Sequence, residues 1–183
     1  MRIIGGELRG KKLVPLRGTA IRPTADRTRE AVFNIIAAKV PGANVLDLFA
    51  GTGAFGLEAL SRGAARAVFV DNAAGALAAI EKNIAACRMQ NRARVIRWDI
   101  IRNLNCLGSV SQGFDIVFLD PPYNCNAVIP TLQNLVQSDA LPAPGVTVIV
   151  EHAPSETITE LPDGLALMDQ RRYGKTLVSF LSI

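Results

Sequence analysis

Four short apolar runs in the chain carry an acidic residue at or near their ends. The runs are NVLDLF, ARAVFVD, ARVIRWD and FDIVFLD, and their acidic residues are Asp47, Asp71, Asp99 and Asp120. If these runs are parallel strands of one sheet, the four carboxylates lie at the same edge, where open α/β sheets bind ligands. Withdrawing carboxylates from water is costly, so a purely structural domain is not expected to gather them there. The pattern predicts a ligand site at this edge.

A glycine-rich loop follows the first run. Gly51, Gly53 and Gly56 match the G-x-G-x-x-G spacing of dinucleotide-binding loops, which is a weak signal alone. The loop has no Lys or Arg, and Asp47 stands just before it. An acidic loop suits a cationic ligand better than a pyrophosphate, and S-adenosylmethionine carries an ammonium and a sulfonium but no phosphate. The residues favour this cofactor, with Asp71 accepting hydrogen bonds from its ribose and the later Asp99 from its adenine.

The tetrapeptide Asp120-Pro121-Pro122-Tyr123 carries the candidate chemistry. An exocyclic amine on a nucleic-acid base is a weak nucleophile because its lone pair is delocalised into the ring. The Asp120 carboxylate and the Pro121 carbonyl can accept its two N–H bonds and localise that lone pair, while the paired prolines fix the turn. Tyr123 offers a face on which the base can stack. Methyl transfer then depends on alignment and electrostatics.

A doubly wound sheet is needed to bring these residues together. Helical segments at 54–63, 73–89 and 126–137 separate the apolar runs, and a fifth run covers 145–151. Alternating strands and helices predict right-handed βαβ units, and continuous apolar runs are typical of parallel strands covered on both faces. In the tail, Tyr173-Gly174 stands between two strand-like runs. The predicted fold class is therefore α/β and Rossmann-like, with a C-terminal antiparallel hairpin.

The segment 1–29 is basic, whereas the rest of the chain is mildly acidic. It carries a net charge of +6, against −2 for the segment 30–183. The strand-like runs RIIGG and KKLVPL predict a small N-terminal β-hairpin, followed by a helix after Thr24 with an apolar face. We divide the chain into a basic hairpin over residues 1–22 and a main domain over 23–183. This charge distribution indicates contact with a polyanion at the basic end.

The composition argues against several other classes of protein. The chain has 183 residues, of which 49% are hydrophobic, enough for one core without disulfides or metal. Its three cysteines, Cys87, Cys106 and Cys125, are widely spaced with no neighbouring His, so neither a disulfide nor a metal site is expected. No apolar run approaches the roughly 20 residues of a membrane span. We expect a cytoplasmic protein without membrane or metal, in which His152 is structural or exposed.

Several segments, taken together, resemble one enzyme family. DLFAGTG and DPPY, with MRIIGGELRGKKL, RPTADRTREAVFNII and the terminal RRYGKT, resemble the RsmD family of 16S rRNA guanine-N2 methyltransferases. The resemblance covers nearly the whole chain, and the N-terminal segments are its specific part because DPPY also occurs in DNA adenine methylases. It implies a class I S-adenosylmethionine-dependent methyltransferase fold. It also implies ribosomal RNA as partner, either free or within a small-subunit assembly intermediate.

The resemblance implies roles for individual residues as well. The target guanine would be held by Asp120, Pro121, Pro122 and Tyr123. The cofactor would be held at the strand ends by Asp47, Phe49, Ala50, Gly51, Gly53, Asp71, Asn72, Asp99 and Ile100. RNA would be gripped by the basic residues Arg9, Lys11, Lys12, Arg22, Arg27 and Arg29.

Two alternatives to this function stay open. A DNA adenine-N6 methyltransferase would share the cofactor site and DPPY, but it normally adds a larger target-recognition segment, and only the segment 121–183 follows Asp120. A catalytically silent RNA-binding assembly factor could share the fold, although the intact acidic and glycine positions count against it. Binding of S-adenosylmethionine by the purified protein separates the second alternative from the enzymes.

Overall fold

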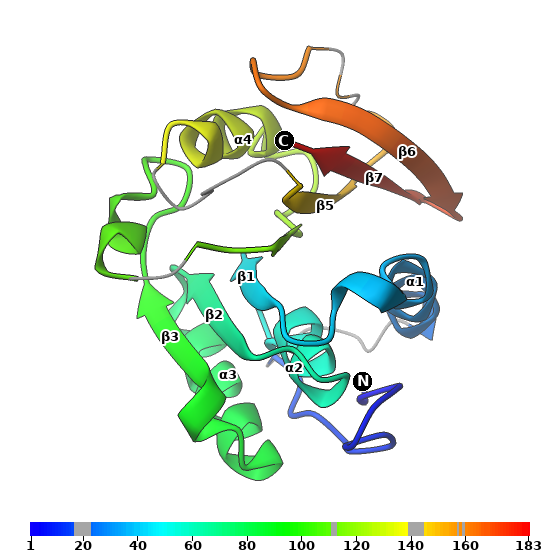
Figure 1. The fold of residues 1–183 in the computed structure, drawn as a ribbon, viewed down its shortest axis with the longest axis vertical. Coiled ribbons are helices and arrows are strands. Elements are labelled where there is room, and N and C mark those ends of the chain that lie inside the picture. Colours follow the sequence, from blue (N-terminus) through cyan, green and yellow to red (C-terminus); the bar gives the residue numbers. More distant parts are fainter. Residues whose placement is uncertain (17–22, 111–112, 139–144, 157, 159) are drawn as a thin grey trace.

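A seven-stranded sheet forms the centre of the computed structural model, which describes residues 1–16, 23–110, 113–138, 145–156, 158 and 160–183. The strand order is β3-β2-β1-β4-β5-β7-β6 (Figure 1). Five strands are parallel, namely β1 (Asn44–Leu48), β2 (Arg66–Asp71), β3 (Ala93–Arg97), β4 (Ile116–Leu119) and β5 (Thr147–His152). The C-terminal hairpin consists of β6 (Ala166–Tyr173) and β7 (Thr176–Ser182), and β7 runs antiparallel to β5. The predicted Rossmann-like fold and terminal hairpin are confirmed.

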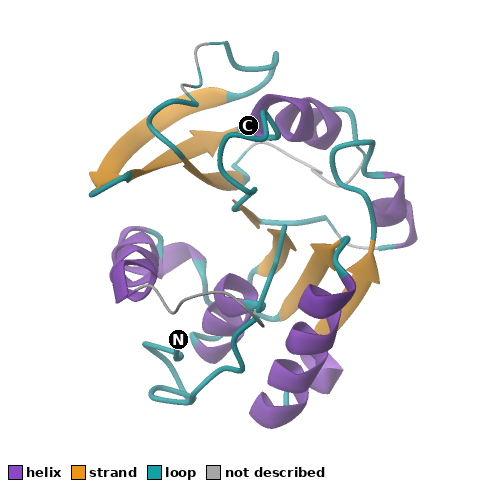
Figure 2. Cartoon of the chain, turned by 180° about the vertical axis from the view of Figure 1, so that it is seen from behind, coloured by secondary structure: helices purple, strands orange, loops and turns teal. Residues whose placement is uncertain are grey.

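Helices cover both faces of the sheet (Figure 2). One face packs against α1 (Pro23–Ile35), α2 (Ala54–Ser61) and α3 (Ala74–Cys87). The other packs against α4 (Val128–Val136) and the short helix η3 (Asn105–Ser109), while η1 (Ala37–Lys39) and η2 (Gln90–Arg92) are single turns. Alternate side chains of a strand point to opposite faces. Val45 accordingly belongs to the first core and Leu46 to the second, which explains the continuous apolar runs.

The strand order places a switch point between β1 and β4. The chain leaves β1 towards β2 and β3, and later returns to the other side of β1 with β4 and β5. Leu48 at the end of β1 pairs with Val70 of β2 and Leu119 of β4. The residues that follow these strands therefore stand at the same level, along the edge where ligands bind in such sheets.

The N-terminal segment 1–16 forms an arm that doubles back on itself beside α2. Its antiparallel pairing is limited to a single bridge between Arg2 and Lys12, with the Ile3 N–H donating to the Lys11 carbonyl at 2.9 Å. Regular strands do not extend from this bridge because the next N–H groups bond to side chains of α2, as described below. Ile3 and Leu13 are buried in the same core as α1 to α3. The arm thus turns back as predicted, but it is built onto the main domain.

Within the described part of the chain, no helix is both long enough and apolar enough to cross a membrane.

Candidate active site at the carboxyl edge of the sheet

The loop after β1 has a backbone that largely requires glycine. Gly51 and Gly53 have φ angles of 58° and 75°, in the left-handed region, and Phe49 shares that region with a φ of 56°, a strained conformation for a residue with a side chain. A Cβ on Gly53 would lie 3.2 Å from the Phe69 ring, and one on Gly56 would overlap that ring. The glycine spacing is thus explained by loop conformation and by close packing of α2 on β2.

Two glycine N–H groups of this loop are bonded to the protein's own carboxylates. The Gly51 N–H donates to Asp71 Oδ2 at 2.9 Å, and the Gly56 N–H donates to Asp47 Oδ2 at 2.9 Å. A pyrophosphate-binding loop needs such N–H groups to face its ligand. The structure therefore argues against a dinucleotide at this loop, in agreement with the acidic character of its sequence.

Asp47 is buried behind the loop, with an exposed fraction of 2%. Its bond to Gly56, in the first turn of α2, ties the positive end of that helix to β1. Burial raises the pKa of Asp47 to about 7; the Gly56 hydrogen bond opposes this shift and the negative charge of Asp71 adds to it. Asp47 thus acts on the shape of the loop, through its bond to Gly56.

Asp71 joins the glycine loop to the start of α3. Its Oδ2 accepts from Gly51, and its Oδ1 accepts from the Ala73 N–H at 2.9 Å. The side chain is half-buried, and the neighbouring Asn72 is exposed. Each carboxylate oxygen has a second lone pair, so these contacts are compatible with the two hydroxyls of a ribose.

The remaining predicted cofactor residues lie in the loops after β1 and β3. Ala50 is buried, and its N–H donates to the Val70 carbonyl at 3.2 Å, which extends the pairing of β1 with β2. Asp99 is exposed, whereas Ile100 beside it is 2% exposed and belongs to the second core. Trp98 donates its indole N–H to the Asn103 carbonyl at 3.0 Å and so closes this turn. A carboxylate beside an apolar side chain suits the amino group and ring of adenine.

The DPPY segment follows β4 directly at the switch point. Asp120 succeeds Leu119, Pro121 is buried and Pro122 is exposed. Tyr123 is half-buried, and its hydroxyl donates to Glu151 Oε1 at 2.9 Å and lies 2.8 Å from Thr176 Oγ1. Burial, together with the nearby negative charge, raises the pKa of Tyr123, so the phenol stays protonated. Its ring is therefore anchored at the hydroxyl end.

Glu151 is a residue of this edge to which the sequence analysis gave no role. It follows Val150, the partner of Leu119, so Asp120 and Glu151 stand at one level on neighbouring strands. Both residues border a closely packed space under α1 and α2, together with Val32 and Phe55 of those helices. The signal was present in the sequence, because Glu151 is the acidic residue that ends the fifth apolar run.

Comparison with known proteins places the chain in a family. Residues 1–182 match the family described as Conserved hypothetical protein 95. The chain belongs to this family. Ribosomal RNA small subunit methyltransferase D of Escherichia coli (strain K12) is 35% identical over 178 residues, covering 96% of this chain and 86% of that protein. The rRNA methyltransferase candidate YlbH of Bacillus subtilis (strain 168) is 34% identical over 179 residues, covering 98% and 97%. The resemblance to the RsmD family is confirmed.

A solved structure extends the similarity to three dimensions. The methyltransferase candidate yhhF from Escherichia coli matches with a TM-score of 0.86 and 32% identity, covering 100% of this chain and 97% of that one. The family likeness therefore includes the arm and the C-terminal hairpin as well as the parallel strands.

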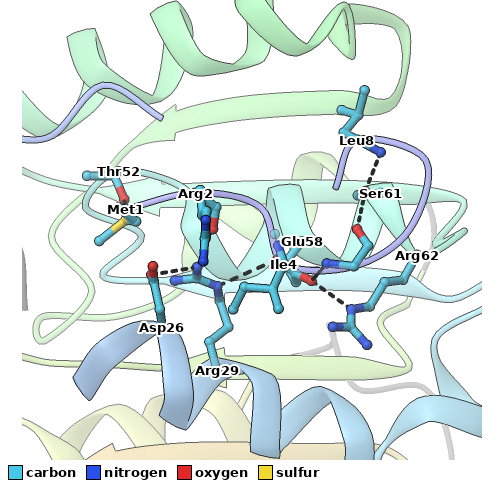
Figure 3. Close-up of polar contacts among 12 residues, drawn as sticks. Met1, Arg2, Ile4, Leu8, Asp26, Arg29, Thr52, Glu58, Ser61 and Arg62 are labelled. Atoms are coloured by element: carbon cyan, nitrogen blue, oxygen red, sulfur yellow. Dashed lines mark hydrogen bonds and ion pairs between the residues drawn. The ribbon is translucent and has the colours of Figure 1, made fainter. Parts of the chain in front are cut away.

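In this family member, Arg29 has a structural position, so the prediction that it contacts RNA is wrong. Its side chain is 2% exposed, and its Nη2 donates to the Arg2 carbonyl at 2.6 Å and to Asp26 Oδ1 at 3.0 Å (Figure 3). Its Nε lies 3.7 Å from Glu58 Oε2. Arg29 therefore holds the arm against α1 and α2.

The other residues predicted to contact RNA are either exposed or outside the described residues. Arg9, Lys11 and Lys12 are exposed on the arm, and Arg27 is exposed on α1. Arg22 lies outside the described residues. These exposed side chains are not buried as Arg29 is, so they are still candidates for contact with a polyanion.

Buried polar side chains of α2 attach the arm to the main domain. Glu58 is fully buried, and its carboxylate accepts from the N–H groups of Ile4 at 2.7 Å and Gly5 at 2.8 Å, and from Arg62 Nε at 2.7 Å. Ser61 Oγ accepts from the Leu8 N–H at 2.9 Å (Figure 3). These bonds replace the ladder that a regular hairpin would form.

Asn83 of α3 links the far end of the arm to the glycine loop. This side chain is fully buried. Its Oδ1 accepts from the Val14 N–H at 2.7 Å, and its Nδ2 donates to the carbonyls of Val14 at 3.2 Å and Thr52 at 2.9 Å. Thr52 is a residue of the loop itself, so the arm and the candidate cofactor site share one polar contact.

Two other features have no part in the candidate site. His152 is buried, with Nε2 2.9 Å from Ser179 Oγ and Nδ1 3.2 Å from the Ala153 carbonyl, so the structural interpretation is confirmed. A pocket of about 230 Å³ lies at the amino ends of β1 to β3, lined in part by Asn44 and Arg66. Among the described residues, no group of three His, Cys, Asp or Glu side chains is arranged to bind a metal ion.

Proposed function

We propose that this protein transfers a methyl group from S-adenosylmethionine to the exocyclic N2 of a guanine in small-subunit ribosomal RNA. The observation that carries the proposal is the position of Asp120-Pro121-Pro122-Tyr123 at the switch point, beside a glycine loop braced by carboxylates. The relatives that share the whole chain are named as methyltransferases of ribosomal RNA. A cytoplasmic location follows from such a substrate.

The strand ends support S-adenosylmethionine as the methyl donor. This cofactor supplies a methyl group on a positively charged sulfur. The loop from Phe49 to Gly53 contains no basic residue, and the Asp71 carboxylate bonded to Gly51 favours a cation. Its backbone would lie along the methionine part, Asp71 would accept from the ribose, and Asp99 with Ile100 would enclose the adenine. Asn72 is exposed beside Asp71, within reach of the same ribose region.

The DPPY residues would prepare the amine for attack. Asp120 and the Pro121 carbonyl accept its two N–H bonds, which turns the lone pair of N2 towards the methyl carbon. As the N–C bond forms, the bond from that carbon to sulfur breaks, and N2 then releases one proton to water or to Asp120. Tyr123, anchored by Glu151 and Thr176, presents its ring to the base. The residues contribute alignment and preorganised charge.

The exposed basic residues of the arm would bind the RNA backbone. Arg9, Lys11 and Lys12 lie on the arm, and Arg27 lies on α1. Phosphate contacts position a nucleic acid without reading its sequence. We propose that the substrate is an assembly intermediate of the small subunit, in which the target guanine is still accessible.

The test is methyl transfer from radiolabelled S-adenosylmethionine to RNA taken from cells that lack the gene. Protein-free 16S RNA and small-subunit particles are labelled separately and digested to nucleosides. The proposal expects N2-methylguanosine at one position, with particles from wild-type cells taking up no label because that position is already modified. Label in N6-methyladenine of DNA would support the first alternative instead. Absence of cofactor binding would support a silent assembly factor.

A further inference from the structure

We infer that the tip of the C-terminal hairpin, residues 171–176, is a second RNA contact that binds phosphates next to the target nucleotide. The cations that carry this contact are Arg172 and Lys175. The inference rests on the proposed function, because it concerns the nucleic acid whose base would lie against Tyr123.

The hairpin tip is joined to the candidate target site by a direct side-chain contact. Thr176 Oγ1 lies 2.8 Å from the hydroxyl of Tyr123, the residue proposed to stack the target base. Thr176 pairs with Tyr173 across the turn, so Gly174 and Lys175 form the connection between β6 and β7. The tip therefore adjoins the place where the target nucleotide and its neighbours along the RNA would lie.

The backbone of the tip has a defined conformation. Gly174 has a φ of 63°, the left-handed value that the tight turns of β-hairpins require at their first central position. Arg172 Nε donates to the Gly174 carbonyl at 3.1 Å, and a guanidinium has further N–H donors for other acceptors. Tyr173 packs against the first core, which fixes the tip to the main domain. The two cations are thus presented on a supported turn.

The charge of the tip is positive and reaches solvent. Arg172 and Lys175 are both exposed. Their neighbour Arg171 is partly compensated, because its Nε lies 2.8 Å from Asp169 Oδ2. β6 is the outermost strand at this side of the described sheet, so the tip stands at the border of the sheet (Figure 1). A phosphate backbone passing this border would meet the two cations.

The acidic character of the candidate site explains why cations are needed beside it. The strand ends carry Asp71, Asp99, Asp120 and Glu151. Phosphates on either side of a target nucleotide would be repelled by this edge, and nearby cations reduce that repulsion. The arm lies on the flank of β1 and β2, to which it is attached through α2, whereas the hairpin lies beyond β5. Cations on both flanks would hold the RNA across the site after β4.

The inference is tested with two double variants that differ in charge at the same positions. Arg172→Gln with Lys175→Gln removes both charges, whereas Arg172→Lys with Lys175→Arg keeps them. The substrate is the RNA or small-subunit particle that the wild-type protein methylates. The neutral variant should bind it about two- to fivefold more weakly for each lost contact, the range of exposed ion pairs. Its slope of log K against log salt should fall by about 0.7–0.9 for each contact.

The charge-keeping variant is the matched control for the neutral variant. It also loses the Arg172 Nε bond to Gly174, so it should keep wild-type RNA affinity and salt dependence only if charge is what matters. Thermal unfolding and calorimetry with S-adenosylhomocysteine check that both variants are folded and bind the product of the cofactor.

A second experiment locates the tip on the RNA. An iron chelate that generates hydroxyl radicals is attached to Lys175→Cys, in a protein that also carries Cys106→Ser and Cys125→Ser because these native thiols are not buried. The radicals cut nearby RNA backbone, and the cuts should cluster within a few nucleotides of the methylated position. The same chelate on Lys82→Cys, exposed on α3, should not produce this cluster.

Three results would overturn the inference alone. The first is wild-type affinity and salt dependence in the folded neutral variant. The second is an equal loss in the charge-keeping variant, which would make Arg172 a support of the turn. The third is RNA cleavage from Lys175→Cys only at positions far from the methylated nucleotide. If the wild-type protein methylates no RNA, the proposed function fails first, and the inference fails with it.

Discussion

The carboxyl edge of the sheet and the N-terminal arm both depend on acidic side chains, but they use them in opposite ways. At the edge, Asp99 is exposed and Asp71 is half-buried. Under the arm, Glu58 is fully buried and accepts from two backbone N–H groups and from Arg62. A buried carboxylate saturated by internal donors holds structure, whereas one that reaches the surface at the end of a strand can meet a ligand.

The basic residues divide in the same way. Arg29 is buried among Arg2, Asp26 and Glu58, while Arg9 on the arm is exposed. The net charge of +6 on residues 1–29 therefore overstates the charge that can face RNA. Burial, rather than residue type, decides which of these cations are structural.

Replacing Asp120 should have the largest effect on the edge and none on the arm. Asp120→Ala removes one preorganised acceptor of the target amine, and losses of this kind cost roughly 10²–10³ in rate. Cofactor affinity should stay within a few-fold, because the contact is with the substrate. Single-turnover methylation and calorimetry with S-adenosylhomocysteine measure the two quantities. Turnover close to wild type would remove Asp120 from the mechanism.

Replacing Glu58 should instead destabilise the arm. Glu58→Ala leaves the Ile4 and Gly5 N–H groups and Arg62 Nε without their acceptor and removes the negative charge beside Arg29. Breaking a buried charge cluster costs about 3–5 kcal/mol. Urea unfolding should show this loss, and limited proteolysis should show cleavage within the segment 1–16. The matched control is Glu81→Ala, an exposed glutamate of α3, which should change the free energy of unfolding by less than about 0.5 kcal/mol. Equal effects of the two variants would contradict the clamp assigned to Glu58.

Asp71 tests whether an edge carboxylate binds the ligand or only braces the loop. Asp71→Ala should weaken S-adenosylhomocysteine binding by roughly tenfold or more, since hydrogen bonds to charged groups contribute about 1.5–3 kcal/mol. A 2′-deoxyribose analogue should lose affinity for the wild type but little for Asp71→Ala. If the mutation weakens both ligands equally, Asp71 acts only through its bonds to Gly51 and Ala73.

Asp47 should give the edge a pH-dependent stability. Its pKa is about 7 when folded against 3.8 ordinarily, so between these values the native state keeps a proton that the unfolded chain releases. The Asp47 contribution to the free energy of unfolding therefore falls as pH rises from about 4 to 7, by at most about 1.4 kcal/mol per unit, and is constant above that range. Asp47→Asn should remove this slope in urea unfolding at several pH values, whereas the exposed Asp163→Asn should keep it. If the free energy of unfolding depends on pH in the same way in the wild type and in Asp47→Asn, Asp47 is not the titrating group.

The edge could be predicted from the sequence, but the interior of the arm could not. Apolar runs ending in Asp47, Asp71 and Asp120 specify parallel strands, and parallel strands place their ends together by geometry alone. Nothing local marks Glu58 or Asn83 as anchors, because their partners are backbone groups of the arm, far from them in the sequence. The glycine spacing alone likewise does not distinguish a dinucleotide from S-adenosylmethionine. The hydrogen-bond partners of the loop N–H groups do so, and they are not visible in the sequence.

The exposed charges of the arm should have the smallest effect on the protein and a graded effect on RNA binding. Arg9→Ala combined with Lys11→Ala and Lys12→Ala should weaken RNA binding and flatten its salt dependence, by about 0.7–0.9 in the slope of log K against log salt for each lost phosphate contact. The affinity for S-adenosylhomocysteine should not change, because the arm stays attached through its backbone to Glu58 and Ser61.

The matched control removes three exposed positive charges from elsewhere on the surface, with substitutions to Ala at Lys82, Arg88 and Arg97. Both triple variants lower the net charge by the same amount, so a purely global electrostatic attraction would weaken RNA binding equally in the two. A larger loss in the arm variant locates the contact on the arm. If the arm variant instead keeps wild-type affinity and salt dependence, the arm is a structural element whose cations only face water. The RNA surface would then lie elsewhere, and the exposed Arg171 and Arg172 on β6 would be the next residues to replace.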